Sequence, residues 1–211
     1  PAAHVEAQLA AVAEDLAPAA VKTGMLATAP LVRQVAGALD RFGWTRYVLD
    51  PVMVATSGDR LLHADAEAVV RDLLVPRAAL VTPNLAEAAL LTGEVVEDEV
   101  SMIRAGERLL GLGAGAALVK GGHLAGDALV DVLVTPDGVT PYRHPRVPTT
   151  STHGTGCTLS AALTACLALG LPLAEAAPTA LDYLHRAIRE APGLGGGHGP
   201  VRHAVPAFPG R

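Results

Sequence analysis

Short apolar runs alternate with longer segments whose apolar positions recur at helical spacing over most of the chain. The short runs, which we predict to be strands, lie at 20–22, 47–50, 79–81 and 116–119. The longer segments, which we predict to be helices, lie at 31–39, 66–74, 84–91 and 100–110. Strands that are apolar throughout are typical of a sheet covered on both faces, and strands that alternate with helices are typical of parallel pairing. The sequence therefore predicts an α/β fold of three layers, αβα, around a mainly parallel sheet.

Three segments of the chain depart from this alternation. Residues 4–16 have a helical pattern ahead of the first strand. Residues 128–134 and 139–142 are typical of a hairpin-like pair of strands that turns at the Pro-Asp-Gly of 136–138. The glycine-rich tail at 193–200 is assigned no element of its own.

Length and composition indicate one globular domain. Half of the 211 residues are apolar, and the charged residues leave a formal net charge of −5 with no cluster of Lys or Arg. We therefore expect one domain and no nucleic acid partner. Two cysteines within one predicted helix argue against a disulfide framework and for a reducing compartment. No apolar run is long enough to cross a membrane and no signal pattern opens the chain, so we expect a cytoplasmic protein with no membrane partner.

Polar residues directly follow four of the predicted strands. They lie at 22–25 (Lys-Thr-Gly-Met), 50–52 (Asp-Pro-Val), 82–84 (Thr-Pro-Asn) and 120–122 (Lys-Gly-Gly). The carboxyl ends of parallel strands meet at one edge of a sheet, and ligands of open α/β sheets bind there. The sequence therefore predicts that these four segments share one rim.

The segment 153–160, His-Gly-Thr-Gly-Cys-Thr-Leu-Ser, opens a further predicted helix. The first N–H groups of a helix lack intrahelical acceptors and the helix dipole is positive there. The backbone at 154–156 can therefore bind a phosphate or the charge that develops in a transition state. The same position favours the thiolate of Cys157. A simple turn followed by a small buried cysteine is the alternative that these residues leave open.

Each polar residue of the rim also has a purely structural interpretation. Asp50 can hold hydrated magnesium or cap a turn. Asn84 and Glu87 form a capping-box pattern, although a carboxylate there can also reach a metal through water. Lys120, between an apolar strand and two glycines, can bind phosphate or extend into solvent, and Lys22 has the same two possibilities.

Two common nucleotide-binding motifs are excluded. No Gly-Lys-Ser/Thr follows a glycine at the Walker A spacing. Residues 111–116 match G-x-G-x-x-A, but they follow a helix and precede a strand, which is the reverse of a dinucleotide site, so we interpret them as a helix end and turn.

His153, His198 and His203 lack metal-ligand spacing with either cysteine, and we interpret them as structural or solvent-exposed.

An anion-binding helix start, a lysine and carboxylates on one rim supply the positioning and charge neutralisation that phosphoryl transfer requires. The motifs occur in the order 21–26, 50–52, 82–87, 119–123, 153–162 and 197–201. In this order, and over nearly the whole chain, they resemble the hydroxymethylpyrimidine/phosphomethylpyrimidine kinases of thiamine synthesis, which are ribokinase-like. The resemblance implies a ribokinase-like fold and ATP-dependent phosphorylation, with Mg²⁺, of a pyrimidine alcohol and then of its monophosphate. We also expect a homo-oligomer, a dimer.

The resemblance further implies a role for each matched residue. The catalytic group, in which the cysteine stands where most ribokinase-like enzymes have an aspartate base, comprises Cys157, Gly154, Thr155 and Gly156. The ATP and phosphate contacts are Lys120, Gly121 and Asn84. The carboxylates that organise magnesium are Asp50 and Glu87. The residues that line the pyrimidine site are Met25, Val52 and Gly24.

The chain departs from the family pattern at its front, where a strand and a glycine-rich substrate segment are expected and nothing matches. It opens on Pro1 with a helical pattern, and we expect 1–211 to be a single kinase domain that lacks those N-terminal strands. Two other functions stay open at this stage. One is pyridoxal/pyridoxine kinase, in which an aspartate would be expected at the position of Cys157, and the other is a non-catalytic module that binds the pyrimidine.

The cysteine itself suggests a hypothesis about the two phosphorylation steps. A phosphate monoester has its second pKa near 6, so at neutral pH it is already largely dianionic and needs little help from a base. An alcohol acceptor needs more help. We therefore predict that the second phosphorylation depends less on Cys157 than the first.

Overall fold

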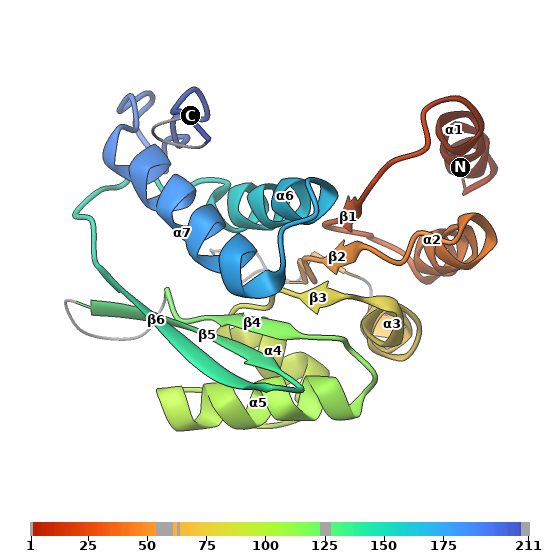
Figure 1. Ribbon diagram of the computed structural model, residues 1–211, viewed down its shortest axis with the longest axis horizontal. Coiled ribbons are helices and arrows are strands. Elements are labelled where there is room, and N and C mark those ends of the chain that lie inside the picture. Colours follow the sequence, from red (N-terminus) through yellow and green to blue (C-terminus); the bar gives the residue numbers. More distant parts are fainter. Residues whose placement is uncertain (1, 54–60, 63, 123–127, 208–211) are drawn as a thin grey trace.

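A computed structural model describes residues 2–53, 61–62, 64–122 and 128–207, and its six strands form one sheet in chain order (Figure 1). The strands are β1 (Val21–Thr23), β2 (Tyr47–Leu49), β3 (Leu80–Val81), β4 (Ala117–Lys120), β5 (Ala128–Thr135) and β6 (Gly138–Pro145). Strands β1 to β4 pair in parallel, and β4, β5 and β6 pair antiparallel. The predicted strands and the predicted hairpin are therefore confirmed, with the parallel part on one side of the sheet and the hairpin on the other.

Helices cover both faces of this sheet (Figure 1). They are α1 (Ala2–Asp15), α2 (Ala29–Phe42), α3 (Ala64–Val69), α4 (Leu85–Thr92), α5 (Glu99–Gly111), α6 (Thr155–Ala168) and α7 (Leu173–Arg189). After α3 the chain continues through a π turn at Val70–Leu74 and a 3₁₀ turn at Val75–Arg77. Helices α6 and α7 lie on one face, helices α2 to α5 lie on the other, and α1 lies beside α2.

The alternation of side chains along each strand separates the two core layers. In β2, Tyr47 and Leu49 pack with the cluster under α2 and α3, whereas Val48 packs with the cluster under α6 and α7. Successive side chains of a strand point to opposite faces, so an all-apolar strand fills both layers at once. The predicted three-layer architecture is thus confirmed, for the reason that the sequence pattern indicated.

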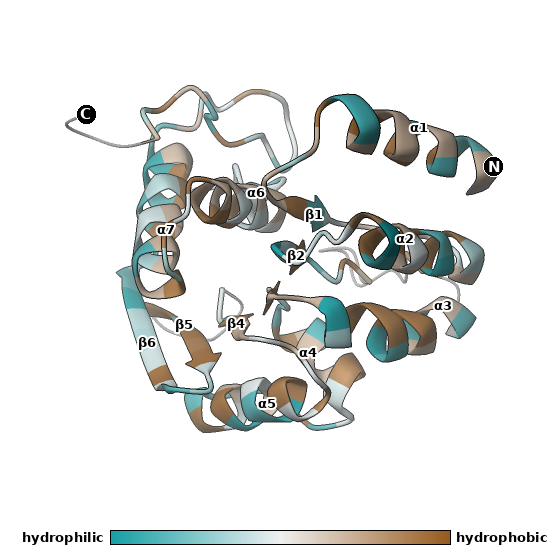
Figure 2. Cartoon of the chain, turned by 45° about the vertical axis from the view of Figure 1, so that its right-hand side comes forward, coloured by the Kyte–Doolittle hydropathy of each residue, from teal (hydrophilic) through white to brown (hydrophobic). Residues whose placement is uncertain are grey.

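The edge strand β6 differs from the strands inside the sheet. Its residues are exposed or half-buried, whereas most of the described β5 residues are buried. Figure 2 shows the same contrast, with β5 brown and β6 pale to teal. A polar outer strand reduces the tendency of an open sheet edge to pair with another chain.

No element is predicted for the segment that forms α7. This helix contains Pro178, which is exposed and interrupts the local helical signal, because proline lacks an N–H and is disfavoured inside helices. Its buried residues Ala177, Ala180 and Leu181 pack on the sheet beside α6 and compensate for that cost. Tertiary packing therefore decides this helix.

The glycines at 111–115 form the predicted helix end and turn. Helix α5 ends at Gly111, and Gly113 has φ +103°, which favours glycine. A β-carbon on Gly115 would lie 2.9 Å from the carbonyl oxygen of Ala79, so the turn passes closely over the chain ahead of β3. The segment is a structural connection, as predicted.

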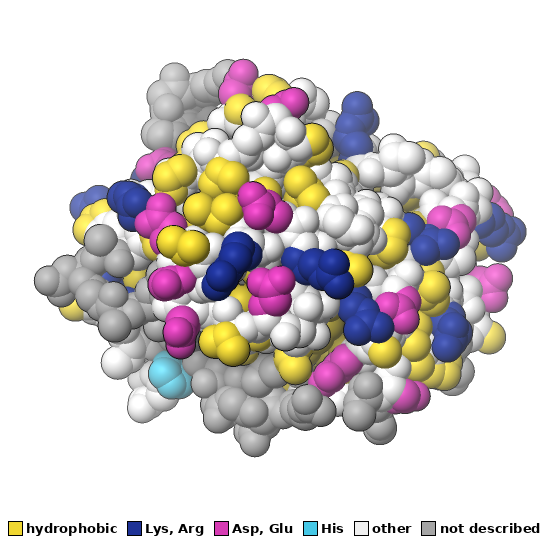
Figure 3. Space-filling view, turned by 90° about the horizontal axis from the view of Figure 1, so that it is seen from below, with side chains coloured by type: hydrophobic (Ala, Val, Ile, Leu, Met, Phe, Trp, Pro, Cys, Tyr) yellow, Lys and Arg dark blue, Asp and Glu magenta, His cyan; other side chains and the backbone are white. Residues whose placement is uncertain are grey.

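The surface seen from below in Figure 3 carries acidic and basic side chains that lie next to one another. Such an arrangement screens each charge with its neighbours rather than building one strong field. Within the described ranges, no helix has both the length and the apolar character needed to span a lipid bilayer.

Candidate active site

The predicted rim is present at the carboxyl ends of the parallel strands. Lys22 lies in β1, Asp50 directly follows β2, Thr82 directly follows β3, and Lys120 ends β4. The adjacent start of α6 supplies Ser160. Residues up to 138 positions apart in sequence therefore meet in one hydrogen-bonded cluster.

Asp50 is the centre of this cluster. It is buried, and each of its carboxylate oxygens has its own partners. Oδ1 lies 3.1 Å from Lys120 Nζ and 3.4 Å from Thr82 Oγ1. Oδ2 lies 3.0 Å from Ser160 Oγ and 3.7 Å from Lys22 Nζ. A buried carboxylate requires such partners, because the desolvation of an ion that has no partner costs about several kcal/mol.

Lys120 connects Asp50 to the start of α4. Its ammonium lies 4.0 Å from Glu87 Oε2, and its backbone N–H donates to the carbonyl of Pro83 at 2.8 Å. Its side chain is largely buried, at 14% exposure, so it does not extend into solvent as the structural interpretation would require. The ammonium also lies next to Gly156, in the first turn of α6, where an added β-carbon would be 3.2 Å from Nζ.

Asn84 and Glu87 form the predicted capping box at the start of α4. The backbone N–H of Asn84 donates to Glu87 Oε2 at 2.8 Å, and the backbone N–H of Glu87 donates to Asn84 Oδ1 at 2.9 Å. Burial raises the pKa of Glu87 above its ordinary value, and the positive charge of Lys120 acts in the opposite direction. The pair therefore stabilises the start of α4. Glu87 also faces the ammonium of Lys120.

The start of α6 presents backbone donors rather than a side-chain cap. Gly154 is left-handed, with φ +80°, and no side chain caps the helix there. Among the described residues, the backbone N–H groups of Gly156 and Cys157 have no acceptor, whereas that of Thr158 donates to the Gly154 carbonyl at 2.8 Å. Unpaired N–H groups at a positive helix end are the elements of an anion site.

Cys157 lies in this first turn and is exposed, while Cys166, further along the same helix, is buried. The alternative of a small buried cysteine therefore describes Cys166 and not Cys157. The carbonyl of Cys157 lies 3.1 Å from Ser160 Oγ, which links the turn to the Asp50 cluster. The thiol is thus accessible beside the unpaired N–H groups.

The tail that follows α7 packs against the start of α6. The backbone N–H of His153 donates to the carbonyl of Gly199 at 3.1 Å, and His203 Nε2 lies 3.0 Å from Thr158 Oγ1. Thr158 Oγ1 also donates to the Gly154 carbonyl at 2.8 Å. These contacts give the backbone of His153 and the side chain of His203 a structural role, which is one of the two possibilities stated for them, structural or solvent-exposed.

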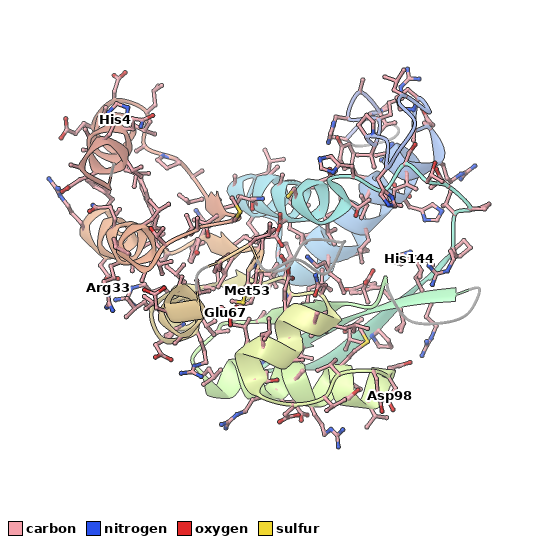
Figure 4. The ribbon with its side chains drawn as sticks, turned by 180° about the vertical axis from the view of Figure 1, so that it is seen from behind. His4, Arg33, Met53, Glu67, Asp98 and His144 are labelled. Atoms are coloured by element: carbon pink, nitrogen blue, oxygen red, sulfur yellow. The ribbon has the colours of Figure 1, made fainter. Side chains whose placement is uncertain are left out.

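A small apolar pocket lies beside the Asp50 cluster and is lined in part by the residues that directly follow Asp50. Gly24 and Val52 line it together with Leu26, Pro51 and Met53. Met53 occupies the interior of the molecule near α3 (Figure 4). Met25, the third residue predicted to contact a pyrimidine, is 51% exposed and is absent from the lining of this pocket.

The carboxylates predicted to organise magnesium are already hydrogen-bonded. Both oxygens of Asp50 and one oxygen of Glu87 have partners, and no group of three or more His, Cys, Asp or Glu in the described part of the chain is placed to hold a metal. Mg²⁺ usually keeps several waters and is bound by substrate phosphates with one or two carboxylates. Because each oxygen of Asp50 already has two partners, Asp50 and Glu87 fit contact through metal-bound water rather than a dedicated cage.

Four contributors were not among the residues to which the resemblance assigned a role: Lys22, Thr82, Asp131 and Ser160. Asp131 Oδ1 accepts from the backbone N–H of Gly121 at 2.9 Å and so fixes the turn that follows Lys120. Burial raises the pKa of Asp131. One signal was available, since Asp131 interrupts an apolar run in β5. Of the 119–123 motif, His123 lies outside the described residues.

Comparison with known proteins identifies the family. A family model described as phosphomethylpyrimidine kinase matches residues 1–202. The hydroxymethylpyrimidine/phosphomethylpyrimidine kinase of Rhizobium meliloti is 52% identical over 204 residues, which cover 94% of this chain and 76% of that protein.

Solved structures agree with this relationship. Phosphomethylpyrimidine kinase from Clostridium difficile is 36% identical, with a TM-score of 0.80 over 89% of this chain and 77% of its own. An ADP complex of Bacillus subtilis pyridoxal kinase is 34% identical, with a TM-score of 0.89 over 95% of this chain and 76% of its own. The predicted ribokinase-like fold is therefore confirmed, and the chain belongs to the phosphomethylpyrimidine kinase family.

Proposed function

We propose that the start of α6 and the Asp50 cluster form the centre that phosphorylates hydroxymethylpyrimidine and then its monophosphate with ATP. The observation that carries this proposal is the position of Lys120, whose ammonium lies between the buried carboxylate of Asp50 and the unpaired N–H groups of the first turn of α6. Phosphoryl transfer depends mostly on positioning and on neutralising the charge of the transferred group. A lysine and a helix N-terminus that face the same point supply both.

Each predicted residue has a defined part in this reaction. An acceptor oxygen attacks the γ-phosphorus, and the bond from that phosphorus to the bridging oxygen of ADP breaks. The backbone at Gly154, Thr155 and Gly156 binds the transferred phosphoryl group, while Lys120, Gly121 and Asn84 bind the phosphates of the nucleotide. Cys157 accepts the proton of the alcohol in the first reaction. In the second reaction the dianionic phosphate attacks without losing a proton.

Asp50 and Glu87 are the residues that would hold a magnesium ion of the nucleotide through its bound water, and the ion would supply neutralisation of phosphate charge. Gly24 and Val52 border the pyrimidine, and Met25 covers it from the exposed side. We also propose that 1–211 forms one domain and assembles as a cytoplasmic homodimer, for which the mass in solution is the direct measurement.

Pyridoxal phosphorylation is the second candidate, because the fold of this chain agrees closely with that of a pyridoxal kinase. The sequence relatives favour the pyrimidine. We therefore expect pyridoxal to be at most a secondary acceptor.

The direct test is to incubate the protein with Mg-ATP and, separately, hydroxymethylpyrimidine, its monophosphate and pyridoxal, and to follow the products by phosphorus NMR. We expect a monophosphate from the alcohol and a diphosphate from the monophosphate. Phosphorylated pyridoxal without a pyrimidine product would replace the proposal with the second candidate. ATP binding without any product would contradict a catalytic role for this chain.

A further inference from the structure

The chain contains only two lysines, and both lie at the same carboxylate. Apart from these two lysines, every Lys or Arg position of the chain is an arginine. Lys22 lies 3.7 Å from Asp50 Oδ2, and Lys120 lies 3.1 Å from Asp50 Oδ1. A chain that uses arginine everywhere else thus has lysine at the two positions of this cluster. Lysine is a compact charge with three donors in different directions, whereas arginine has a planar fork suited to paired contacts.

The two ammonium groups face different parts of the site. Lys120 faces Gly156 in the anion-binding turn and Glu87 at the start of α4. Lys22 faces Gly24, whose added β-carbon would lie 3.6 Å from Nζ. Gly24 lines the apolar pocket beside Val52. Lys120 is therefore the cation of the nucleotide side, and Lys22 is the cation of the acceptor side.

Ser160 fixes the direction of Lys22. Lys22 Nζ donates to Ser160 Oγ at 3.0 Å, and that hydroxyl can donate its single proton to Asp50 Oδ2 at 3.0 Å. The ammonium of Lys22 has three N–H donors. Among the described residues, one donor bonds to Ser160 Oγ, and Asp50 lies at the longer distance of an ion pair, 3.7 Å. The remaining donors are available to a ligand, and the side chain is 23% exposed.

The two reactions of the proposed function differ in the charge of their acceptor. The alcohol is neutral, whereas the monophosphate carries about two negative charges at neutral pH. Lys120 and the α6 N-terminus serve the transferred group in both reactions. A second cation on the acceptor side is required only when the acceptor itself is a phosphate, because two anionic groups then have to approach each other.

We propose that Lys22, held by Ser160 and Asp50, binds the phosphate of the monophosphate acceptor and thereby makes the second phosphorylation possible. This inference rests on the proposed function. It also has a consequence for the first reaction, because Lys22 would hold the monophosphate product at the site for the next ATP. Loss of Lys22 should therefore release the monophosphate as the end product.

The first experiment compares Lys22→Met with the wild-type protein in both reactions, measured separately. A hydrogen bond from a charged donor corresponds to a change of about 10- to 100-fold, so we expect kcat/KM for the monophosphate to fall by about that factor. We expect kcat/KM for the alcohol to fall by a clearly smaller factor, because Lys22 supports the Asp50 cluster in both reactions but contacts a phosphate acceptor only in the second. Ser160→Ala should weaken the second reaction in the same direction and by a smaller factor. Arg33→Met, on α2 at the far side of the molecule from β6 (Figure 4), is the control for loss of one positive charge.

The second experiment uses the wild-type protein and does not depend on how a variant folds. Protein labelled with ¹³C-lysine gives side-chain signals from only two residues, which Lys22→Arg assigns. We expect the Lys22 signal to shift on addition of the pyrimidine monophosphate and not on addition of the alcohol. We expect the Lys120 signal to shift with ADP.

Each other outcome has a definite meaning. Equal losses of both reactions in Lys22→Met, or a Lys22 signal that responds to ADP and not to the monophosphate, would overturn the inference. If the wild-type protein phosphorylates neither pyrimidine, the proposed function fails. In that case a shift of the Lys22 signal with the monophosphate would still support Lys22 as a phosphate-binding residue. If the signal did not shift, the binding site would be overturned together with the function.

Discussion

The backbone of Gly156 lies directly against the ammonium of Lys120. A β-carbon at residue 156 would be 3.2 Å from Lys120 Nζ, which is closer than an ordinary van der Waals contact. The glycine in the first turn of α6 therefore does more than permit a turn, because its missing side chain leaves the space in which the lysine charge sits. The anion-binding turn and the lysine consequently act as one unit.

Gly156→Ala tests this relationship. The methyl group should displace the ammonium by a few tenths of an ångström from its position beside the anion-binding turn, and misplacement of this kind can cost up to about 100-fold in rate. We expect kcat to fall by about tenfold in both reactions, with little loss of stability, because alanine is a better helix former than glycine. Steady-state kinetics and thermal unfolding measure the two effects.

Gly37→Ala is the matched control. Gly37 lies within α2, and an added β-carbon there would meet nothing within 4 Å. That variant should gain up to about 1 kcal/mol of stability and keep its activity. Unchanged kinetics in Gly156→Ala would show that the position of Lys120 is not critical.

Cys157→Ala separates the two chemical steps. Because the side chain is exposed, its removal should leave the packing of α6 intact. General base catalysis typically contributes about 100- to 10,000-fold, so we expect a large loss for the alcohol acceptor and a smaller one for the monophosphate. The pattern is the opposite of that expected for Lys22→Met. Equal losses of both activities would contradict a selective role for the thiol.

Cys166→Ala controls for loss of a thiol from the same helix. Cys166 is buried, so its truncation should lower the unfolding temperature and leave the ratio of the two activities unchanged.

Glu87→Gln should change how stability depends on pH. Burial raises the pKa of Glu87 in the folded protein above its ordinary value of 4.5, so the folded state binds this proton more tightly than the unfolded chain does. The stabilisation linked to that proton is present at low pH and is lost as the pH rises through the folded pKa. Glutamine does not titrate, so the variant should gain stability relative to the wild type as the pH rises from the ordinary value of 4.5 through the raised pKa of the folded protein.

Urea unfolding at several pH values across this range provides the measurement. Glu107→Gln, on the exposed side of α5, controls for the removal of one negative charge. A difference between Glu87→Gln and wild type that stays constant with pH, or that favours the wild type as pH rises, would contradict the expected direction.

Gly106→Ala should destabilise the fold although it improves helix propensity. A β-carbon on Gly106, inside α5, would clash with the Cγ2 methyl of Val134 and lie 2.9 Å from its Cβ. Overpacking of this kind costs about 1–3 kcal/mol and exceeds the gain of about 1 kcal/mol from replacing glycine in a helix. We expect a net loss of about 1–2 kcal/mol in unfolding free energy.

The same helix provides the control for this variant. An added β-carbon at Gly111 would meet nothing within 4 Å, so Gly111→Ala should not destabilise the protein. The double variant Gly106→Ala with Val134→Ala should recover part of the loss, because it removes the methyl groups that clash. Full stability of Gly106→Ala alone would mean that α5 and β5 can move apart without cost.

The sequence by itself determined the order of helices and strands and the segments of the rim. These features depend on signals within a few residues: the alternation of apolar positions, the Asn84 and Glu87 capping pair, and the glycines ahead of Cys157. Local backbone preferences and burial patterns produce them, so they can be recognised without knowing which segments meet. The order of the motifs also identified the family.

Only the tertiary structure decided which of these residues act together. The contacts of Asp50 with Lys22, Lys120 and Ser160 cross between β1, β2, β4 and α6, and they depend on strand order and register. No periodicity encodes such a meeting, because each side chain was equally compatible with a turn or with solvent. The same holds for α7, whose proline is tolerated only because its small buried residues pack on the sheet.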